Sequence, residues 1–461
     1  MSGPKSVPWS TFNNDLHVMA QKRMEKLVPA HRQDDSLLRN GFPYHKRLKA
    51  HDSCVNALAF SASDDGRFLA SGGDDLKVQI WDLHRQDQSA PNCTLRGAIS
   101  NIFNIAFSAT NKYIFSGGAD EMVMQYDFTT ASTLLSAMRT RPSMYANGQY
   151  DNNASIRDIS CHPYNDEIFI SASEDGRIVM YDARTANTQG EIQLLAEATG
   201  ARFNPVLEHI FATSDKQRLQ LRDARMAFGS RSSLSDGGVV RTYSTRLTRT
   251  TAGERQRCSP EVNSFTFDAA GQNIAATTLH HYPVIYALSD PAPVAVCTSG
   301  DLPAEEGSYS NSCTMKHGSF SGRALNGNYY AAGSDDFRGY VWRLPSLAEL
   351  LERRTEVPRN EAIPADAVAY IGPDTDSPYI PATLTRPTCQ LTGHNSIVNS
   401  TIFHPTLPHI FTAGIERDVL IHGPTPGSPC VAGLRRSPPS AAVRRVDGSQ
   451  RRLRCRINST G

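Results

Sequence analysis

Residues 54–82 read CVNALAFSASDDGRFLASGGDDLKVQIWD and contain three short runs of strand-forming residues separated by turn residues. The apolar run at 55–60 leads into a polar turn at 63–66. A second run at 67–71 ends in Gly-Gly-Asp-Asp, and a third at 77–81 ends in Trp-Asp. Short, partly alternating runs bounded by turn residues are typical of β-strands. The stretch therefore predicts a unit of three short strands.

The same order of strands and turns returns six times along the chain. The further copies lie at 102–127, 156–184, 198–225, 262–286, 311–343 and 389–422. Units of about 40–45 residues in which Trp-Asp follows a strand are typical of WD-repeat blades. The repeats therefore predict an all-β fold, a seven-bladed WD40 β-propeller.

Four polar residues of the first unit have the spacing of a hydrogen-bonded tetrad found in such blades. They are His51, Ser71, Asp75 and Trp81. A His, Ser and Asp together could also suggest a catalytic triad. A catalytic site occurs once, however, whereas Asp120, Asp175 and Asp336 occupy the corresponding turns of other units. We therefore interpret the set as buried polar groups that satisfy one another.

The ends of the repeat region predict how the ring closes. Residues 44–48 form an outer strand with no inner strands before it, and 397–422 supply three inner strands with no outer strand after them. The first strand can complete the last blade and so remove an exposed sheet edge. The propeller is predicted to span 44–423, with the residues beyond 423 outside it.

Four segments do not follow the repeat. Residues 1–43 form an N-terminal extension with an amphipathic helix at 10–28, which either packs on the propeller or is offered to a partner. Residues 226–257 are predicted to be a flexible Ser/Thr/Arg-rich loop. The insertion 344–388 is predicted to begin with a short capped helix and continue as loose chain. Residues 424–461 are predicted to be a disordered basic tail. This tail either is only solvated, acts as a nuclear localisation signal or contacts acidic polymers.

Composition limits the classes of function. The net charge of +1 argues against a dedicated nucleic-acid binder, apart from the basic tail. The nine cysteines contain no CxxC pair, and no apolar run approaches the ~20 residues that span a bilayer. We therefore expect a nuclear or cytoplasmic protein with no membrane partner. The sequence has no phosphate-binding loop, dinucleotide fingerprint, HExxH or GxSxG, so we expect no enzyme activity, cofactor or metal.

A tetrapeptide ending shared by units three and four indicates a binding site. Asp182 and Arg184 follow the third strand of one unit, and Asp223 and Arg225 follow that of the next. Both arginines should emerge on the bottom face, which is the face reached by the chain after each third strand. Arg offers a planar, permanently charged fork to a carboxylate or carbonyl. Two such forks on adjacent blades predict a docking site, unless each Arg serves only to pair within its own blade.

Several stretches resemble a known family. They are HDSCVNALAFS at 51–61, LASGGDDLKVQIWD at 69–82, NSCTMK at 311–316, GSDDFRGYVWR at 333–343 and GHNSIVN at 393–399. With the Asp-x-Arg pairs, they resemble substrate receptors of the cullin-4 ubiquitin ligase, the DDB1- and CUL4-associated factors. The chain departs from the family pattern at Tyr181 and Arg222, where the family prefers Trp, and at His422-Gly423.

The resemblance implies a function and a partner. Arg184 and Arg225 would contact the ligase's adaptor, damage-specific DNA-binding protein 1, and Asp182 and Asp223 would position them. The helix at 10–28 would be placed like an adaptor-docking helix. Another face would recruit an unidentified protein for ubiquitination, while the chain itself catalyses nothing. The alternative hypothesis is a structural scaffold of a chromatin or RNA-processing complex that contacts nucleic acid through its basic tail.

Overall fold

The computed structural model describes residues 41–437, apart from short segments. The segments left out are 86, 129–132, 140–153, 186, 230–235, 252–253, 301, 303–306, 359–360, 362, 365–366, 373–377, 428–430 and 432. The predicted helix at 10–28 and most of the predicted tail lie outside the described residues.

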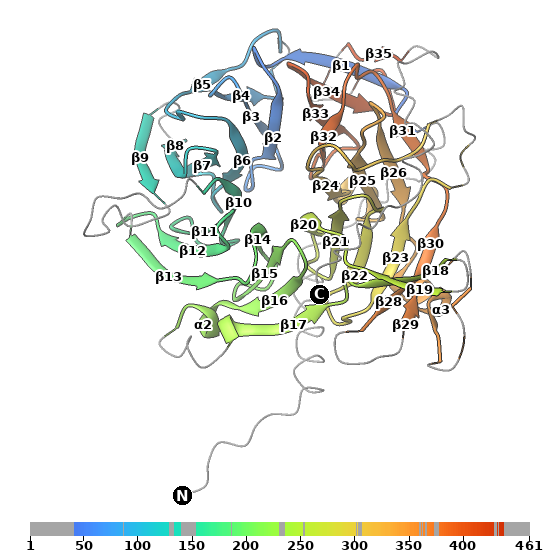
Figure 1. Cartoon of the computed structure of the whole chain (residues 1–461). Helices are drawn as coiled ribbons and strands as arrows, with labels where there is room; N and C mark the ends of the chain where they lie inside the picture. Colours follow the sequence, from blue (N-terminus) through green and yellow to red (C-terminus); the bar gives the residue numbers. More distant parts are fainter. Residues whose placement is uncertain are drawn as a thin grey trace, which may run out of the picture.

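Seven antiparallel sheets follow one another around a ring, as the repeats predicted (Figure 1). Blade 1 consists of β2 (Val55–Phe60), β3 (Phe68–Gly73), β4 (Val78–Asp82) and β5 (Cys93–Leu95). Blade 2 consists of β6 (Ile102–Phe107), β7 (Tyr113–Gly118), β8 (Met122–Asp127) and β9 (Thr133–Arg139). Blade 3 consists of β10 (Ile156–Cys161), β11 (Ile168–Ser173), β12 (Arg177–Asp182) and β13 (Asn187–Gln193).

The remaining blades follow the same plan. Blade 4 consists of β14 (Ala198–Phe203), β15 (Ile210–Asp215), β16 (Leu219–Asp223) and β17 (Val239–Tyr243). Blade 5 consists of β20 (Val262–Phe267), β21 (Asn273–Thr278), β22 (Val284–Ala287) and β23 (Pro293–Cys297). Blade 6 consists of β24 (Gly318–Phe320), β25 (Tyr329–Gly333), β26 (Gly339–Arg343) and β31 (Cys389–Leu391). Blade 7 is β32 (Val398–Phe403), β33 (Ile410–Gly414), β34 (Asp418–Gly423) and β1 (Tyr44–Lys49).

The core consists of apolar layers between neighbouring blades. Blades 1 and 2 meet through Ala70, Ile80 and Ile105, which are all buried. Gly72 faces this layer, and a Cβ atom there would lie 2.7 Å from Ile105 Cδ1. Glycine therefore allows the second strand of blade 1 to approach its neighbour. The repeated apolar positions of the sequence become these layers because strand side chains alternate between the two faces of each blade.

The predicted ring closure is confirmed. Strand β1 pairs antiparallel with β34, with Leu48 opposite Val419 and Tyr44 opposite Gly423. Leu48 is fully buried with Val419 in the layer between blades 7 and 1. Strands more than 360 positions apart in the sequence are thus brought together. Closure removes the open sheet edge that an unfinished blade would leave.

The prediction that all residues beyond 423 lie outside the propeller is wrong. The short strand β35 (Arg435–Arg436) pairs with β1 opposite Tyr44 and His45. Val431 and Leu434 are buried against the same layer as Leu48. These apolar side chains interrupt the basic, Pro-rich sequence and provide the burial that holds this segment on blade 7.

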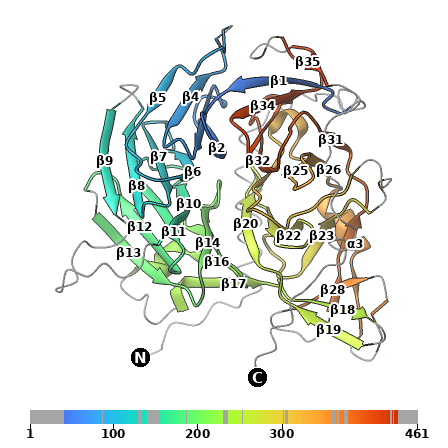
Figure 2. The same cartoon turned by 45° about the horizontal axis from the view of Figure 1, so that its top comes forward.

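The predictions of loose chain at 226–257 and 344–388 are also wrong. Strand β17 lies within the first insertion and is the fourth strand of blade 4. The two insertions also share a further sheet in the order β19 (Glu254–Cys258), β18 (Leu247–Thr251), β28 (Val368–Ile371), β29 (Pro378–Ile380) and β27 (Thr355–Glu356). Figure 2 shows β18, β19 and β28 beyond blade 5.

Two further elements belong to the second insertion. The predicted short helix is α3 (Leu347–Arg353), whose N-cap Ser346 accepts a hydrogen bond from the Glu349 backbone N–H at 3.3 Å. Strand β30 (Ala382–Leu384) adds to blade 5 in parallel with β23. None of the helices in the described residues is long and apolar enough to cross a membrane.

Candidate functional site

The first Asp-x-Arg pair lies at the end of β12, the third strand of blade 3. Asp182 ends β12 and is buried, whereas the Arg184 side chain is 67% exposed. Arg184 donates to the two carboxylate oxygens of Asp182, from Nε to Oδ1 at 3.2 Å and from Nη2 to Oδ2 at 2.8 Å. The Arg184 backbone N–H also donates to Oδ1 at 3.0 Å. The carboxylate therefore fixes both the turn and the guanidinium.

The second pair repeats this geometry on blade 4. Arg225 donates from Nε to Asp223 Oδ1 at 3.1 Å and from Nη2 to Oδ2 at 2.6 Å. Its backbone N–H donates to Oδ1 at 2.9 Å, which makes Asp223 the N-cap of α2 (Ala224–Ala227). The Arg225 side chain is 62% exposed and Asp223 is buried. We call each such pair, a buried Asp with an exposed bidentate Arg, a clamp.

The two clamps occupy equivalent positions on adjacent blades. Asp182 lies opposite Ile168 in β11, and Asp223 lies opposite Ile210 in β15, which is the first residue of the second strand in each blade. The guanidinium of Arg184 lowers the pKa of Asp182, and Asp223 raises the pKa of Arg225. The Asp182 carboxylate is therefore ionised at neutral pH, and both guanidinium groups are charged.

An arginine that is hydrogen-bonded to the aspartate of its own blade can still contact a partner protein. Each Asp receives two of the five N–H groups that a guanidinium carries. Because most of each Arg side chain is exposed, a partner carboxylate or carbonyl can reach the fork. Holding the fork in one orientation before binding reduces the side-chain entropy that a partner contact would otherwise cost.

The two departures from Trp in these blades are accommodated differently. Tyr181 is buried and stacks on Phe169, with ring centroids 4.9 Å apart. Arg222 is also buried, and it donates from Nε to Thr213 Oγ1 at 2.9 Å and from Nη1 to the Gly237 carbonyl at 2.7 Å. Burial lowers the pKa of Arg222 to about 10. Arg222 thus anchors the connection to β17 beside the Arg225 clamp.

The predicted tetrad residues of blade 1 form a buried chain of hydrogen bonds. His51 Nδ1 lies 2.8 Å from Asp75 Oδ1, and His51 Nε2 lies 2.9 Å from Ser71 Oγ. The Trp81 indole N–H donates to Ser71 Oγ at 3.4 Å. Ser71 is completely buried, so no substrate can reach its hydroxyl. The geometry fits a structural role for this tetrad.

Blade 7 builds the same chain from different residues. His394 bridges Glu416 Oε2 at 3.0 Å and Thr412 Oγ1 at 2.7 Å, and Thr412 Oγ1 lies 2.8 Å from His422 Nε2. Thr replaces Ser, Glu replaces Asp and His422 replaces Trp. The His422-Gly423 ending therefore completes the last blade.

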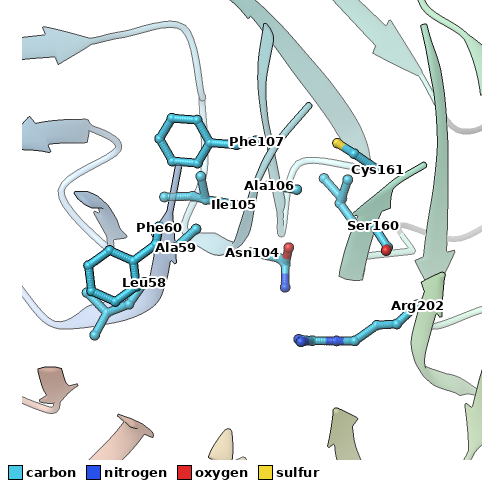
Figure 3. Close-up of a pocket in the computed structure, with 11 residues that line it drawn as sticks. Leu58, Ala59, Phe60, Asn104, Ile105, Ala106, Phe107, Ser160, Cys161 and Arg202 are labelled. Atoms are coloured by element: carbon cyan, nitrogen blue, oxygen red, sulfur yellow. The ribbon is translucent and has the colours of Figure 1, made fainter. Parts of the chain in front are cut away.

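A pocket of about 310 Å³ lies between the innermost strands of blades 1 to 4. Figure 3 shows Arg202 extending into it toward Asn104. Arg202 Nε donates to the buried Asp158 at 3.0 Å, and Asn104 Nδ2 donates to the same carboxylate at 2.7 Å. Since Asp158 balances the Arg202 charge, the pocket offers a weaker anchor for an acidic partner than the exposed clamps. Within the described residues, no three His, Cys, Asp or Glu side chains are placed to hold a metal ion.

Comparison with known proteins agrees with the fold. The model of the family described as "WD domain, G-beta repeat" matches residues 42–82 and 89–127. Human DDB1- and CUL4-associated factor 5 is 30% identical over 393 residues, which cover 85% of this chain and 35% of that protein. Human WD and tetratricopeptide repeats protein 1 is 29% identical over 213 residues, covering 43% of this chain and 29% of that protein.

A more distant similarity extends to a histone acetyltransferase subunit. Histone acetyltransferase type B subunit 2 of Candida glabrata is 22% identical over 206 residues, which cover 44% of this chain and 47% of that protein. The chain spans about a third of the length of DDB1- and CUL4-associated factor 5.

Proposed function

Because this chain belongs to the WD-repeat proteins and is similar in sequence to DDB1- and CUL4-associated factor 5, we propose that it is a non-catalytic substrate receptor. It docks the adaptor of a cullin-4 ubiquitin ligase and recruits a protein for ubiquitination. The observation that carries the proposal is the pair of clamps, Asp182–Arg184 and Asp223–Arg225, at equivalent positions of adjacent blades. They offer two preset, charged forks on the bottom face.

The opposite face has features that suit a second protein partner. Leu195 and Ile99 lie in connections between blades, and their side chains are among the most exposed large apolar groups of the described residues. Ile415 lies on the same face, in the turn between β33 and β34. An adaptor bound to the bottom face would leave these side chains accessible to a second protein. We assign substrate recruitment to this face, in the nucleus or cytoplasm.

Co-precipitation tests the adaptor contact. Wild-type chain should retain damage-specific DNA-binding protein 1 from a cell extract, and the Arg184→Ala/Arg225→Ala variant should retain at least about tenfold less, since charge-assisted bidentate contacts are strong. Lys216→Ala is a matched control, because Lys216 is a half-exposed, ion-paired cation on the opposite face. Undiminished binding by a folded double variant would refute the clamp argument.

The similarity to a histone acetyltransferase subunit favours one alternative, a scaffold in a chromatin complex. In that case the basic residues beyond Ser437 should supply salt-sensitive nucleic-acid binding. Removal of 438–461 tests this without disturbing the buried Val431 and Leu434. DNA binding that disappears on removal, together with a chain that does not retain the adaptor, would favour the scaffold.

A further inference from the structure

Four successive blades each present a cation on the bottom face with a more buried carboxylate beneath it. Blades 3 and 4 present the clamp residues Arg184 and Arg225. Blade 1 presents Arg67, whose side chain is 44% exposed over Asp82 at 9%, and blade 2 presents Lys112, 44% exposed over Glu167 at 18%. Figure 1 shows these blades following one another around one half of the ring.

The Arg67 pair reproduces the clamp geometry with an arginine from another part of the repeat. Asp82 ends β4 opposite Phe68, as Asp182 ends β12 opposite Ile168. Arg67 donates from Nε to Asp82 Oδ1 at 3.0 Å and from Nη2 to Oδ2 at 2.7 Å. The carboxylate thus occupies the clamp position, although His84 stands where the Asp-x-Arg pattern has Arg.

Lys112 is the exposed cation of blade 2, which lies between blades 1 and 3. It directly precedes β7, as Arg67 directly precedes β3. Its ammonium donates to Glu167 Oε1 of the next blade at 2.7 Å and lies 4.7 Å from the centre of the Tyr113 ring. The hydrogen bond to Glu167 holds the cation toward blade 3, where Glu167 lies beside β11.

In each of the four pairs the positive charge faces outward and the negative charge lies deeper. Each pair is formally neutral, but the cation is the exposed member and the carboxylate is the covered member. A partner that contacts these four pairs therefore meets their cations before their carboxylates. Complementary potentials favour acidic partner surfaces and increase the rate of encounter.

We propose that the adaptor-docking surface spans blades 1 to 4, with Arg67 and Lys112 acting beside Arg184 and Arg225 as contacts for a row of acidic groups on the adaptor. This inference rests on the proposed function and extends it from two residues to four.

The test measures binding of purified damage-specific DNA-binding protein 1 to full-length chain by biolayer interferometry at low and high salt. Arg67→Gln and Lys112→Gln should each weaken binding roughly two- to fivefold, and the double variant roughly tenfold, as expected for partly exposed charge contacts. High salt should reduce these differences because it screens exposed charges. Lys216→Gln, on the opposite face, should leave binding unchanged.

Two conservative variants separate lost contact from lost folding. Lys112→Arg keeps the charge and should restore most of the affinity, whereas Arg67→Lys keeps the charge but loses the bidentate contact with Asp82 and should restore only part of it. If the Gln double variant binds like wild type while Arg184→Ala/Arg225→Ala does not bind, the four-blade surface is refuted and the two-clamp function stands. If wild-type chain does not bind the adaptor at all, the proposed function fails and the inference fails with it.

Discussion

At the scale of single residues, the carboxylates are as important to the proposed site as the arginines. Asp182 is buried beneath Arg184 and receives three hydrogen bonds from it, two from the guanidinium and one from the backbone. An Arg without this partner would retain its charge but sample many rotamers. We therefore regard Asp182 and Asp223 as positioning residues for the two forks.

Asp182→Asn combined with Asp223→Asn should weaken adaptor binding about three- to tenfold although both arginines remain. An Asn oxygen can still accept the backbone N–H, so the turn is kept, but the bidentate charged contact is lost. Isothermal titration calorimetry with the purified adaptor would measure the change, with thermal melting to verify the fold. Equal affinity for wild type and the variant would show that the arginines need no fixed orientation.

Some site residues could be predicted from the sequence and others could not. Arg184 and Arg225 are predictable candidates because Asp-x-Arg follows two successive third strands. Arg67 was missed because its carboxylate partner, Asp82, lies 15 positions later and meets it only through strand pairing. His422 was interpreted as a departure because only the structure shows that its ring reaches Thr412.

At the scale of elements, two distant insertions fold together. Leu247 of β18 pairs with Tyr370 of β28, and Tyr370 is buried with its hydroxyl 2.9 Å from His281 Nε2. Neither insertion alone shows strong strand periodicity, and the pairing that joins them, β18 with β28, links residues more than a hundred positions apart. Such pairing depends on tertiary context, which explains why the sequence predicted loops here.

Tyr370→Ala should lower the free energy of unfolding by about 3–5 kcal/mol, the usual cost of truncating a buried aromatic side chain. The amides of β18 should also exchange faster with deuterium, because the shared sheet loses its anchor on blade 5. Tyr370→Phe should cost only about 1 kcal/mol, since it removes one hydrogen bond and keeps the ring. Unchanged β18 exchange in the Ala variant would mean that the insertions fold independently of this contact.

At the scale of the whole molecule, ring closure makes stability depend on pH. Histidines gather where blade 7 joins the ring, and burial lowers the pKa of His404 to about 3 and that of His422 well below its ordinary value. His404 Nδ1 accepts from the backbone N–H groups of Thr406 and Leu407, at 3.2 and 3.1 Å. This arrangement requires the neutral ring.

Stability should therefore fall as the pH is lowered from 7.5 through 5.5. The folded-state pKa of His404 lies below the unfolded value of 6.5. Below pH 6.5 the unfolded chain takes up a proton that the folded chain does not, at about 1.4 kcal/mol per pH unit for such a group. Urea titrations would show the decline. His404→Asn, which keeps an acceptor oxygen, should make it shallower, and an unchanged slope would contradict this assignment.

The seven-bladed ring itself is predictable because each unit repeats the same strands and turns, and because the outer strand predicted at 44–48 has no inner strands before it. The consequence for function is that one face carries the arginine clamps of adjacent blades at equivalent positions. Any partner that uses both clamps must therefore lie across blades 3 and 4.

A cryo-electron microscopy structure of the full chain bound to damage-specific DNA-binding protein 1 would show whether the adaptor uses both clamps. We predict that the adaptor lies on the bottom face, with carboxylate or carbonyl oxygens within about 3 Å of the Arg184 and Arg225 guanidinium groups, the range of charge-assisted hydrogen bonds. A complex in which the adaptor covers another face and leaves both arginines in solvent would contradict it.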